Sequence, residues 1–218
     1  MIRDTLTKKI EKSQARLKQE PRNYIGASII GSPCLRQIWY EFKGIEAEEV
    51  PTKTIRTWAI GKNLEGLILD WLEEAGLKIV RLYWDLKSEK EPSFQGHVDA
   101  LWEKNKKEWQ GIIEIKTAKN ASFNIFAKKG VKEWNPQYYA QIQSYMGMSK
   151  IHSAYILVLN KDNSAISDEL VTFDESFYRQ LEDKALALAN AVSEPLRVNN
   201  SPLFYLCKMC KFKKVCHR

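Results

Sequence analysis

Two segments in the middle of the chain place charged side chains among apolar residues. Asp99 ends the run Gly-His-Val-Asp, and Glu114 and Lys116 lie two positions apart in Ile-Glu-Ile-Lys. Residues 109–116 have the composition of a strand, in which side chains at i and i+2 share one face, so Glu114 and Lys116 point the same way. Charges in an apolar strand are costly unless they are paired or bind a metal. We therefore expect these three side chains to form a site.

Phosphodiester hydrolysis gives a chemical reason for this arrangement. Carboxylates on adjacent strands bind Mg²⁺ or Mn²⁺ through hard oxygen ligands, and the backbone carbonyl of Ile115 could add a further ligand. Such a metal lowers the pKa of a bound water and neutralises charge on the phosphate. Lys116 could orient that water or stabilise the transition state. The alternative is a strand-end Glu–Lys pair with an unrelated aspartate.

Two expected helices add polar groups to this site. Glu65 interrupts a largely apolar face of the helix expected at 54–75, which a third metal-ligand role would explain. Gln137, Gln141 and Tyr145 form an i, i+4, i+8 row that could contact a DNA backbone without reading its sequence. The alternatives are a glutamate at the edge of the apolar stripe and an ordinary polar helix face.

The four cysteines are unevenly placed along the chain. Cys207, Cys210 and Cys216 crowd the last dozen residues, whereas Cys34 lies near the start. Disulfides are rare inside cells, so a thiolate metal site is the better expectation. The spacing suits an iron–sulfur cluster, and structural zinc is the alternative. Either group would join the two ends of the chain and stabilise the fold.

Composition restricts the class of protein. The chain has 218 residues, of which 44% are hydrophobic and 28% charged, and we expect one soluble globular domain over 1–218. The net charge of +7 is compatible with a polyanionic partner but does not identify one. No apolar run is long enough for a membrane helix and no secretory signal is present, so we expect an intracellular, cytoplasmic protein without a membrane partner.

Apolar periodicity gives the expected elements. Helices are predicted over 4–20, 33–42, 54–75, 120–129, 135–148 and 174–193. Strands are predicted over 78–86, 94–102, 109–116, 151–160 and 167–173, followed by an irregular tail that carries the last cysteines. This order predicts an α/β fold with a central mixed β-sheet flanked by helices.

The Gly-x-Val-Asp, Glu-Ile-Lys and Gln141-x-x-x-Tyr145 motifs, in this order, resemble the RecB-like branch of the PD-(D/E)XK nucleases. With Cys34 and Cys207-x2-Cys210-x5-Cys216, the chain looks most like CRISPR-associated iron–sulfur nucleases of the Cas-four type. It is also similar to the iron–sulfur nuclease domains of AddB and Dna-two proteins and to phage exonucleases. Many relatives have histidine where this chain has Glu65.

The resemblance implies a restriction-endonuclease-like core, a Mg²⁺ or Mn²⁺ site and a [4Fe–4S] cluster. It implies that Asp99 and Glu114 bind the metal, that Lys116 is the catalytic lysine, and that Gln141 and Tyr145 grip the substrate. The expected activity is exonucleolytic cleavage of single-stranded or end-containing DNA, in CRISPR spacer processing or in phage recombination and repair. Proteins of CRISPR adaptation or of phage recombination are the expected partners. The alternative is a DNA-binding module whose chain ends are joined by the metal at the cysteines and which does not cleave DNA.

Overall fold

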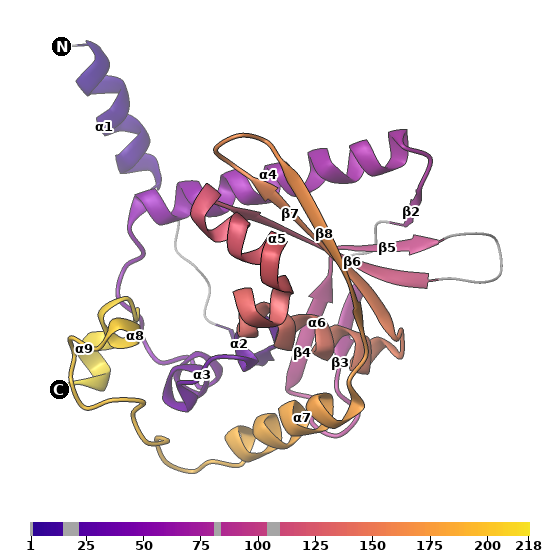
Figure 1. The fold of residues 1–218 in the computed structure, drawn as a ribbon. Coiled ribbons are helices and arrows are strands. Elements are labelled where there is room, and N and C mark those ends of the chain that lie inside the picture. The colour runs from indigo at the N-terminus through magenta and orange to yellow at the C-terminus, as the bar shows by residue number, and fades with distance from the viewer. Residues whose placement is uncertain (1, 15–21, 81–83, 104–109) are drawn as a thin grey trace.

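The computed structural model describes residues 2–14, 22–80, 84–103 and 110–218 and contains two β-sheets (Figure 1). The larger sheet has the order β2 (Lys78–Val80), β5 (Ala100–Glu103), β6 (Gln110–Ala118), β7 (Ser153–Asn160) and β8 (Ile166–Thr172). Among the described strands of this sheet, β6 and β7 pair in parallel and the other neighbours pair antiparallel, so the sheet is mixed. The smaller sheet has the order β1 (Ile25–Gly26), β4 (Phe94–Val98) and β3 (Trp84–Lys87). The predicted α/β architecture is confirmed.

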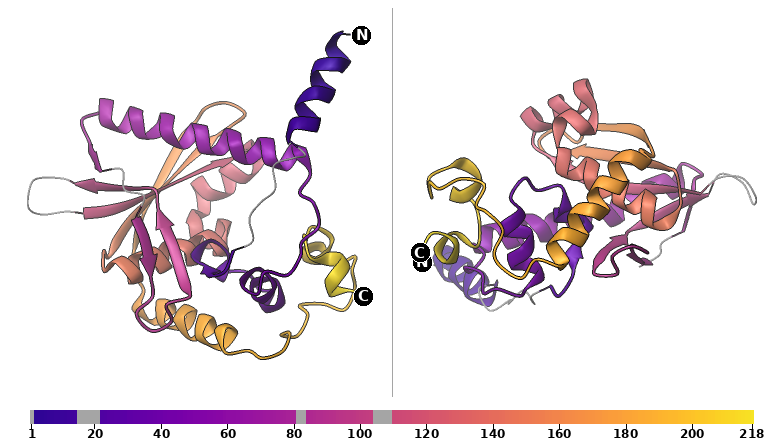
Figure 2. Two further views of the ribbon diagram at one scale, coloured as in Figure 1. Left: turned by 180° about the vertical axis from the view of Figure 1, so that it is seen from behind. Right: turned by 90° about the horizontal axis from the view of Figure 1, so that it is seen from below.

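Helices cover both faces of the larger sheet. On one face lies α4 (Thr52–Glu74), which contacts β6 and β2. On the other lie α5 (Asn120–Trp134) and α6 (Pro136–Ser149), and α7 (Glu175–Ala189) packs against α6 and β4. The remaining helices are α1 (Ile2–Gln14), α2 (Ala27–Ile30), α3 (Leu35–Phe42), α8 (Tyr205–Lys208) and α9 (Lys213–Cys216). Figure 2 shows α1 projecting from the body, with α8 and α9 beside α3. Within the described ranges, no helix is both long and apolar enough to cross a bilayer.

Strand β6 separates two apolar cores. Ile113 and Ile115 face α4 and pack with Ile68 and Leu69 of that helix. Ile112 faces the other way, into the larger core that includes α6 and α7. Since strand side chains alternate, Glu114 lies on the same face of β6 as Ile112. The sheet therefore carries the glutamate on its α6 side.

Two predicted strands are each divided between the sheets. Residues 94–102 form β4 and β5, and the chain passes from the small sheet to the large one at Asp99. Residues 78–86 likewise contribute to β2 and β3, which lie in different sheets. Burial alternates without interruption through Phe94, Gly96, Val98 and Ala100. Because the period is unbroken, hydrophobic patterning alone does not reveal the change of sheet at Asp99.

Other element boundaries also differ from those predicted. The helix expected at 120–129 continues to Trp134 across a kink at Gly130, whose φ of 75° favours glycine. The helix expected at 174–193 ends at Ala189, and the tail contains α8 and α9, which periodicity did not predict. Residues 15–20 of the helix expected at 4–20 fall outside the described residues.

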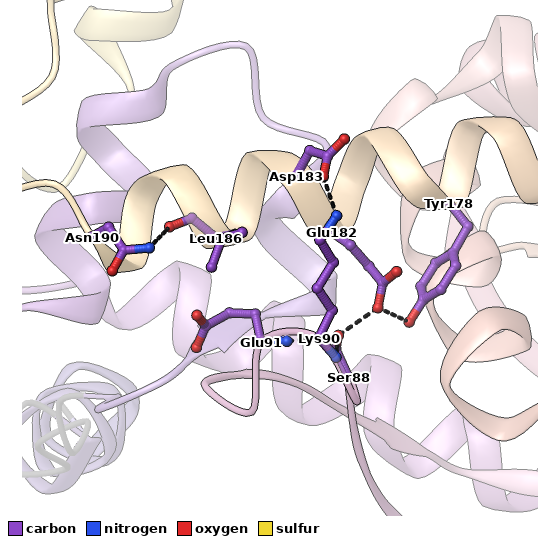
Figure 3. A network of polar contacts seen from close by, with 8 residues as sticks. All are labelled: Ser88, Lys90, Glu91, Tyr178, Glu182, Asp183, Leu186 and Asn190. Atoms are coloured by element: carbon purple, nitrogen blue, oxygen red, sulfur yellow. Dashed lines mark hydrogen bonds and ion pairs between the residues drawn. The ribbon is translucent and has the colours of Figure 1, made fainter.

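A polar network joins α7 to the turn between β3 and β4 (Figure 3). Ser88 in this turn is only 2% exposed and donates its hydroxyl hydrogen bond to Glu182. The same carboxylate accepts from the Tyr178 hydroxyl at 2.9 Å, and Lys90 pairs with Asp183. Ser88 Oγ also accepts backbone hydrogen bonds from Lys90 and Glu91. These contacts fix the hairpin that leads into β4 and hence to Asp99.

Candidate active site

Glu114 lies at the centre of the candidate site, in the middle of β6. Its side chain is 1% exposed, and one carboxylate oxygen accepts a hydrogen bond from Lys116 Nζ. The other oxygen, Oε2, is buried and has no hydrogen-bond partner among the described residues. Burial raises the pKa of Glu114, while the Lys116 ammonium acts in the opposite direction. A buried carboxylate oxygen without a partner is costly, and a bound cation would offset that cost.

Lys116 shares the α6 side of β6 with Glu114, as the i, i+2 spacing predicts. Burial acts to lower the pKa of Lys116, but the Glu114 carboxylate more than compensates, and the pKa is raised. The ammonium of Lys116 therefore remains charged at neutral pH. Its Nζ also lies 4.8 Å from the centroid of the Tyr138 ring on α6.

Asp99 is placed beside Glu114 by strand register. In the antiparallel β5–β6 ladder Ala100 pairs with Ile113, so the residue before Ala100 lies next to the residue after Ile113. Asp99 is exposed, and its charge contributes to raising the pKa of Glu114. The carboxylates expected on adjacent strands are therefore neighbours, although Asp99 lies at a junction between sheets rather than inside a strand.

Glu65 approaches the same site from α4. Burial, followed by the charge of Asp99, raises the pKa of Glu65 to about 7, and Glu114 adds to the shift. Helix α4 passes close to β6 here, because a Cβ at Gly61 would lie 3.9 Å from Thr117 Oγ1. Glu65 therefore lies close enough to Asp99, Glu114 and Lys116 for their charges to affect its pKa.

Gln141 and Tyr145 lie beneath the acidic site, on α6. Gln141 Nε2 donates to the Tyr145 hydroxyl at 2.7 Å, and both side chains are buried. Burial, followed by the charge of Glu114, raises the pKa of Tyr145 well above its usual value. Gln137, the third member of the predicted row, donates instead to the backbone carbonyl of Ser28 at 2.7 Å. Gln141 and Tyr145 therefore form a pair next to the carboxylates, whereas Gln137 forms a hydrogen bond with α2.

Gly96 leaves the space that the Tyr145 ring occupies. A Cβ at this position would lie 2.6 Å from one ring carbon of Tyr145 and 3.1 Å from the Ala27 Cβ. We expect Gly96→Ala to displace Tyr145 and to destabilise the protein by about 1–3 kcal/mol, as overpacking does. Urea denaturation measures this loss. Gly66→Ala is the matched control, since a Cβ there meets no atom within 4 Å. Equal stability of both variants would show that the close approach of Tyr145 imposes no constraint.

The acidic side chains have suitable chemistry for a hard divalent cation, since they offer carboxylate oxygens and one buried oxygen without a partner. In the described part of the chain, however, there is no group of three or more histidine, cysteine, aspartate or glutamate side chains that could hold a metal. Ile115 lies between Glu114 and Lys116, just beyond the last β5–β6 pair.

Sequence reasoning missed a second polar cluster near Asp99. The Tyr24 hydroxyl lies 3.2 Å from His97 Nε2, and His97 Nδ1 lies 2.7 Å from an Asp85 carboxylate oxygen. The guanidinium of Arg22 lies 5.8 Å from the Tyr24 ring centroid and acts to lower the pKa of Tyr145. Only His97 could have been noticed in the sequence, because it lies two positions before Asp99.

All four cysteines line one cavity between α3 and the C-terminal tail. None forms a disulfide. Burial raises the pKa of the Cys207 and Cys210 thiols, and neighbouring cysteines contribute to both shifts. His217 also lines the cavity, and its Nε2 is buried without a hydrogen-bond partner among the described residues. The structure therefore brings the distant Cys34 and the three tail cysteines to one cavity. In the described ranges, however, they do not form a group that could hold a metal.

A family model described as a YqaJ-like viral recombinase domain matches residues 7–152. No curated protein sequence matches the chain. An alkaline exonuclease from Laribacter hongkongensis, LHK-Exo, superposes with a TM-score of 0.58 at 14% identity, covering 84% of this chain and 90% of that one. Its complex with dAMP gives a TM-score of 0.57 at 15% identity, with the same two coverages.

A third solved structure, that of SSO0001, covers more of the chain. It has a TM-score of 0.57 at 20% identity and covers 97% of this chain and 93% of that one. At these identities the likenesses show a shared fold. The family match contains Glu65, Asp99, Glu114, Lys116 and Tyr145 and ends before the three C-terminal cysteines.

Proposed function

The chain belongs to the YqaJ-like viral recombinase domain family, and on this basis we propose that it is a metal-dependent DNA exonuclease acting in phage recombination. Its substrate would be single-stranded or end-containing DNA. The observation that carries the proposal is the buried Glu114 carboxylate, which has one oxygen without a partner and lies beside Asp99 and Lys116. A purely structural Glu–Lys pair would have no use for that oxygen or for two further carboxylates nearby.

Each side chain of the candidate site has a distinct role in this proposal. Glu65, Asp99 and Glu114, with the Ile115 carbonyl, would hold Mg²⁺ or Mn²⁺. The bound metal supplies an activated water and neutralises charge on the phosphate. Lys116 remains protonated because of the nearby carboxylates, so it can donate hydrogen bonds to the water or to a phosphate oxygen. Gln141 and Tyr145 would contact the DNA backbone at the inner wall of the site.

The comparisons support DNA as the substrate. LHK-Exo is described as an alkaline exonuclease and was crystallised with dAMP, a nucleotide. We extend this substrate class to the present chain because the fold is shared and the acidic residues lie within the matched region. CRISPR spacer processing is the competing role, because the cysteine spacing resembles that of CRISPR-associated iron–sulfur nucleases. A DNA-binding module without activity is disfavoured because Asp99, Glu114 and Lys116 are all present.

The cysteine cavity supports a second part of the proposal. We propose that Cys34, Cys207, Cys210 and Cys216 bind a [4Fe–4S] cluster, with zinc as the alternative. This proposal is supported by the position of the four thiols, which come from the two ends of the chain, line one cavity and are not used in a disulfide. Four thiolates suit either group. His217 offers a further nitrogen at the same wall, which would matter most for zinc.

Digestion of end-labelled DNA tests the nuclease proposal. We expect single-stranded or end-containing DNA to be degraded with Mg²⁺ or Mn²⁺ and to remain intact with EDTA. A covalently closed circle is the matched control for the requirement for an end. Intact DNA under all metal conditions would leave only the DNA-binding alternative.

Glu65→Gln tests the third carboxylate. If Glu65 binds the metal, the variant should need at least about tenfold more Mn²⁺ for half-maximal activity. Glu65→His, which supplies a nitrogen ligand, should restore part of the affinity. Unchanged metal dependence in Glu65→Gln would remove Glu65 from the site.

The raised pKa of Glu65 gives a second, activity-free measurement. Because its pKa is about 7 when folded and 4.5 ordinarily, Glu65 favours the folded state at low pH. In EDTA, this contribution is lost as the pH rises through about 7. The melting temperature of Glu65→Gln should therefore fall less than that of the wild type between about pH 5 and about pH 8.

A further inference from the structure

An aromatic ring contacts the charged group of the candidate catalytic lysine. Lys116 Nζ lies 4.8 Å from the Tyr138 ring centroid, within the range in which an ammonium is attracted to a ring face. Tyr138 is half-buried, and it is not one of the Gln137, Gln141 and Tyr145 row on the same helix. The contact joins β6 to the first turn of α6.

The backbone of Tyr138 is held by the N-terminal cap of α6. The Asn135 side chain accepts hydrogen bonds from the backbone N–H groups of Gln137 at 3.0 Å and Tyr138 at 3.3 Å. Pro136 occupies the first position of the helix, where its fixed φ fits and its missing N–H costs nothing. The residue that carries the ring is therefore in a well-ordered turn.

The Tyr138 ring packs against Trp134, which in turn packs against Phe126. The Tyr138 ring centroid lies 5.3 Å from that of Trp134, which in turn lies 5.1 Å from that of Phe126. The Trp134 indole also donates to Ser122 Oγ at 2.7 Å, which fixes the plane of the indole. The row Phe126–Trp134–Tyr138 thus runs from α5 to α6 and ends at Lys116.

We propose that Tyr138 is a positioning residue that holds the Lys116 ammonium in place for catalysis. This inference rests on the proposed nuclease function. In the metal-free protein Lys116 donates to Glu114. If Glu114 held a metal, its carboxylate would be only partly available to Lys116, and the ring of Tyr138 would keep the ammonium at the site. The hydroxyl of Tyr138 is not needed for this role, because the attraction comes from the ring face.

Removing the ring while keeping the bulk tests this role. Tyr138→Met should lower kcat by about 3- to 30-fold, the range that corresponds to losing a partly desolvated cation–π contact. KM for DNA should change little, and Tyr138→Phe should retain activity close to wild type. Tyr138→Leu provides a second ring-free variant if the methionine variant folds poorly. A rise in KM with unchanged kcat would instead make Tyr138 a DNA contact and overturn the proposal.

A double-mutant cycle separates this role from general packing. If Tyr138 acts through Lys116, Tyr138→Met should cause no further loss in a Lys116→Ala background. Equal losses in both backgrounds would overturn the proposal, because they would show that Tyr138 acts without the lysine.

Nuclear magnetic resonance gives a readout that does not depend on cleavage. The ε-methylene protons of Lys116 next to the ring should resonate upfield of other lysines in the wild type and in Tyr138→Phe. They should return to ordinary positions in Tyr138→Met, with Lys116→Arg used for assignment. An upfield signal in a protein that cuts no DNA would overturn the nuclease function but support the contact. Ordinary shifts in an active wild-type enzyme would overturn the role of Tyr138 alone.

Discussion

Asp99→Asn and Glu114→Ala are expected to abolish DNA cleavage while leaving DNA binding largely intact. Both substitutions remove a carboxylate that would hold the metal, and the metal provides several kcal/mol of transition-state stabilisation, or about a thousandfold or more in rate. Turnover of end-labelled DNA with Mg²⁺ or Mn²⁺ measures the first effect. Binding of the same DNA in EDTA measures the second.

The two substitutions control for each other because their environments differ. Asp99 is exposed, so Asp99→Asn should leave the folded state unchanged and any loss of cleavage would be chemical. Glu114 is buried beside Lys116, so Glu114→Ala also leaves the largely buried Lys116 ammonium without its carboxylate partner and should lower the melting temperature. Glu89→Ala is the matched control, since Glu89 is an exposed carboxylate that pairs with Lys150 outside the site. Full activity in Asp99→Asn would contradict the site as proposed.

The sequence was sufficient to predict the strand that carries the site. The apolar run around Glu114 and Lys116 indicated a buried strand, and i, i+2 spacing placed both side chains on one face, where they form an ion pair. The helix expected at 135–148 likewise begins within one residue of its predicted start, at Pro136. These features are local, because they depend on residues only a few positions apart.

Contacts between distant segments could not be predicted in this way. The change of sheet at Asp99 is not visible in the hydrophobic period, since burial stays in phase through Ala100. The contact between Tyr138 and Lys116 depends on how α6 packs on β6, which no pattern within either segment encodes. The same is true of the space beside Gly96, which is set by the Tyr145 ring on another element.

The cysteine cavity could be predicted from the sequence only in part. Cysteine spacing predicted that Cys34 would meet the tail, and all four thiols do line one cavity. The cations beside them were not predicted. Arg36 Nη1 lies 4.0 Å from Cys216 Sγ and 3.3 Å from Glu194, while Lys184 Nζ donates to the carbonyls of Ile30 and Ser32 just before Cys34. Positive charge next to several thiolates would offset part of their mutual repulsion.

The second large effect is expected at the cysteines. Protein purified without oxygen should be brown, absorb at about 400 nm and contain about four irons per chain if a [4Fe–4S] cluster is bound. Cys34→Ala should remove the colour as completely as Cys210→Ala, even though Cys34 is far from the tail in sequence. Both variants should also melt earlier or aggregate, because metal–thiolate bonds between α3 and the tail contribute to folding free energy.

Iron content and melting temperature together distinguish the possible outcomes. Lys208→Ala is the matched control, because Lys208 follows Cys207 directly but is exposed and does not line the cavity. It should keep both the colour and the melting temperature. Colourless protein with one zinc per chain would overturn the iron–sulfur assignment and retain the four-thiolate site, with His217 as a further candidate ligand. If the variant with all four cysteines changed to alanine folded as stably as the wild type, the cavity would have no structural role, since a cluster joining α3 to the tail cannot be removed without loss of stability.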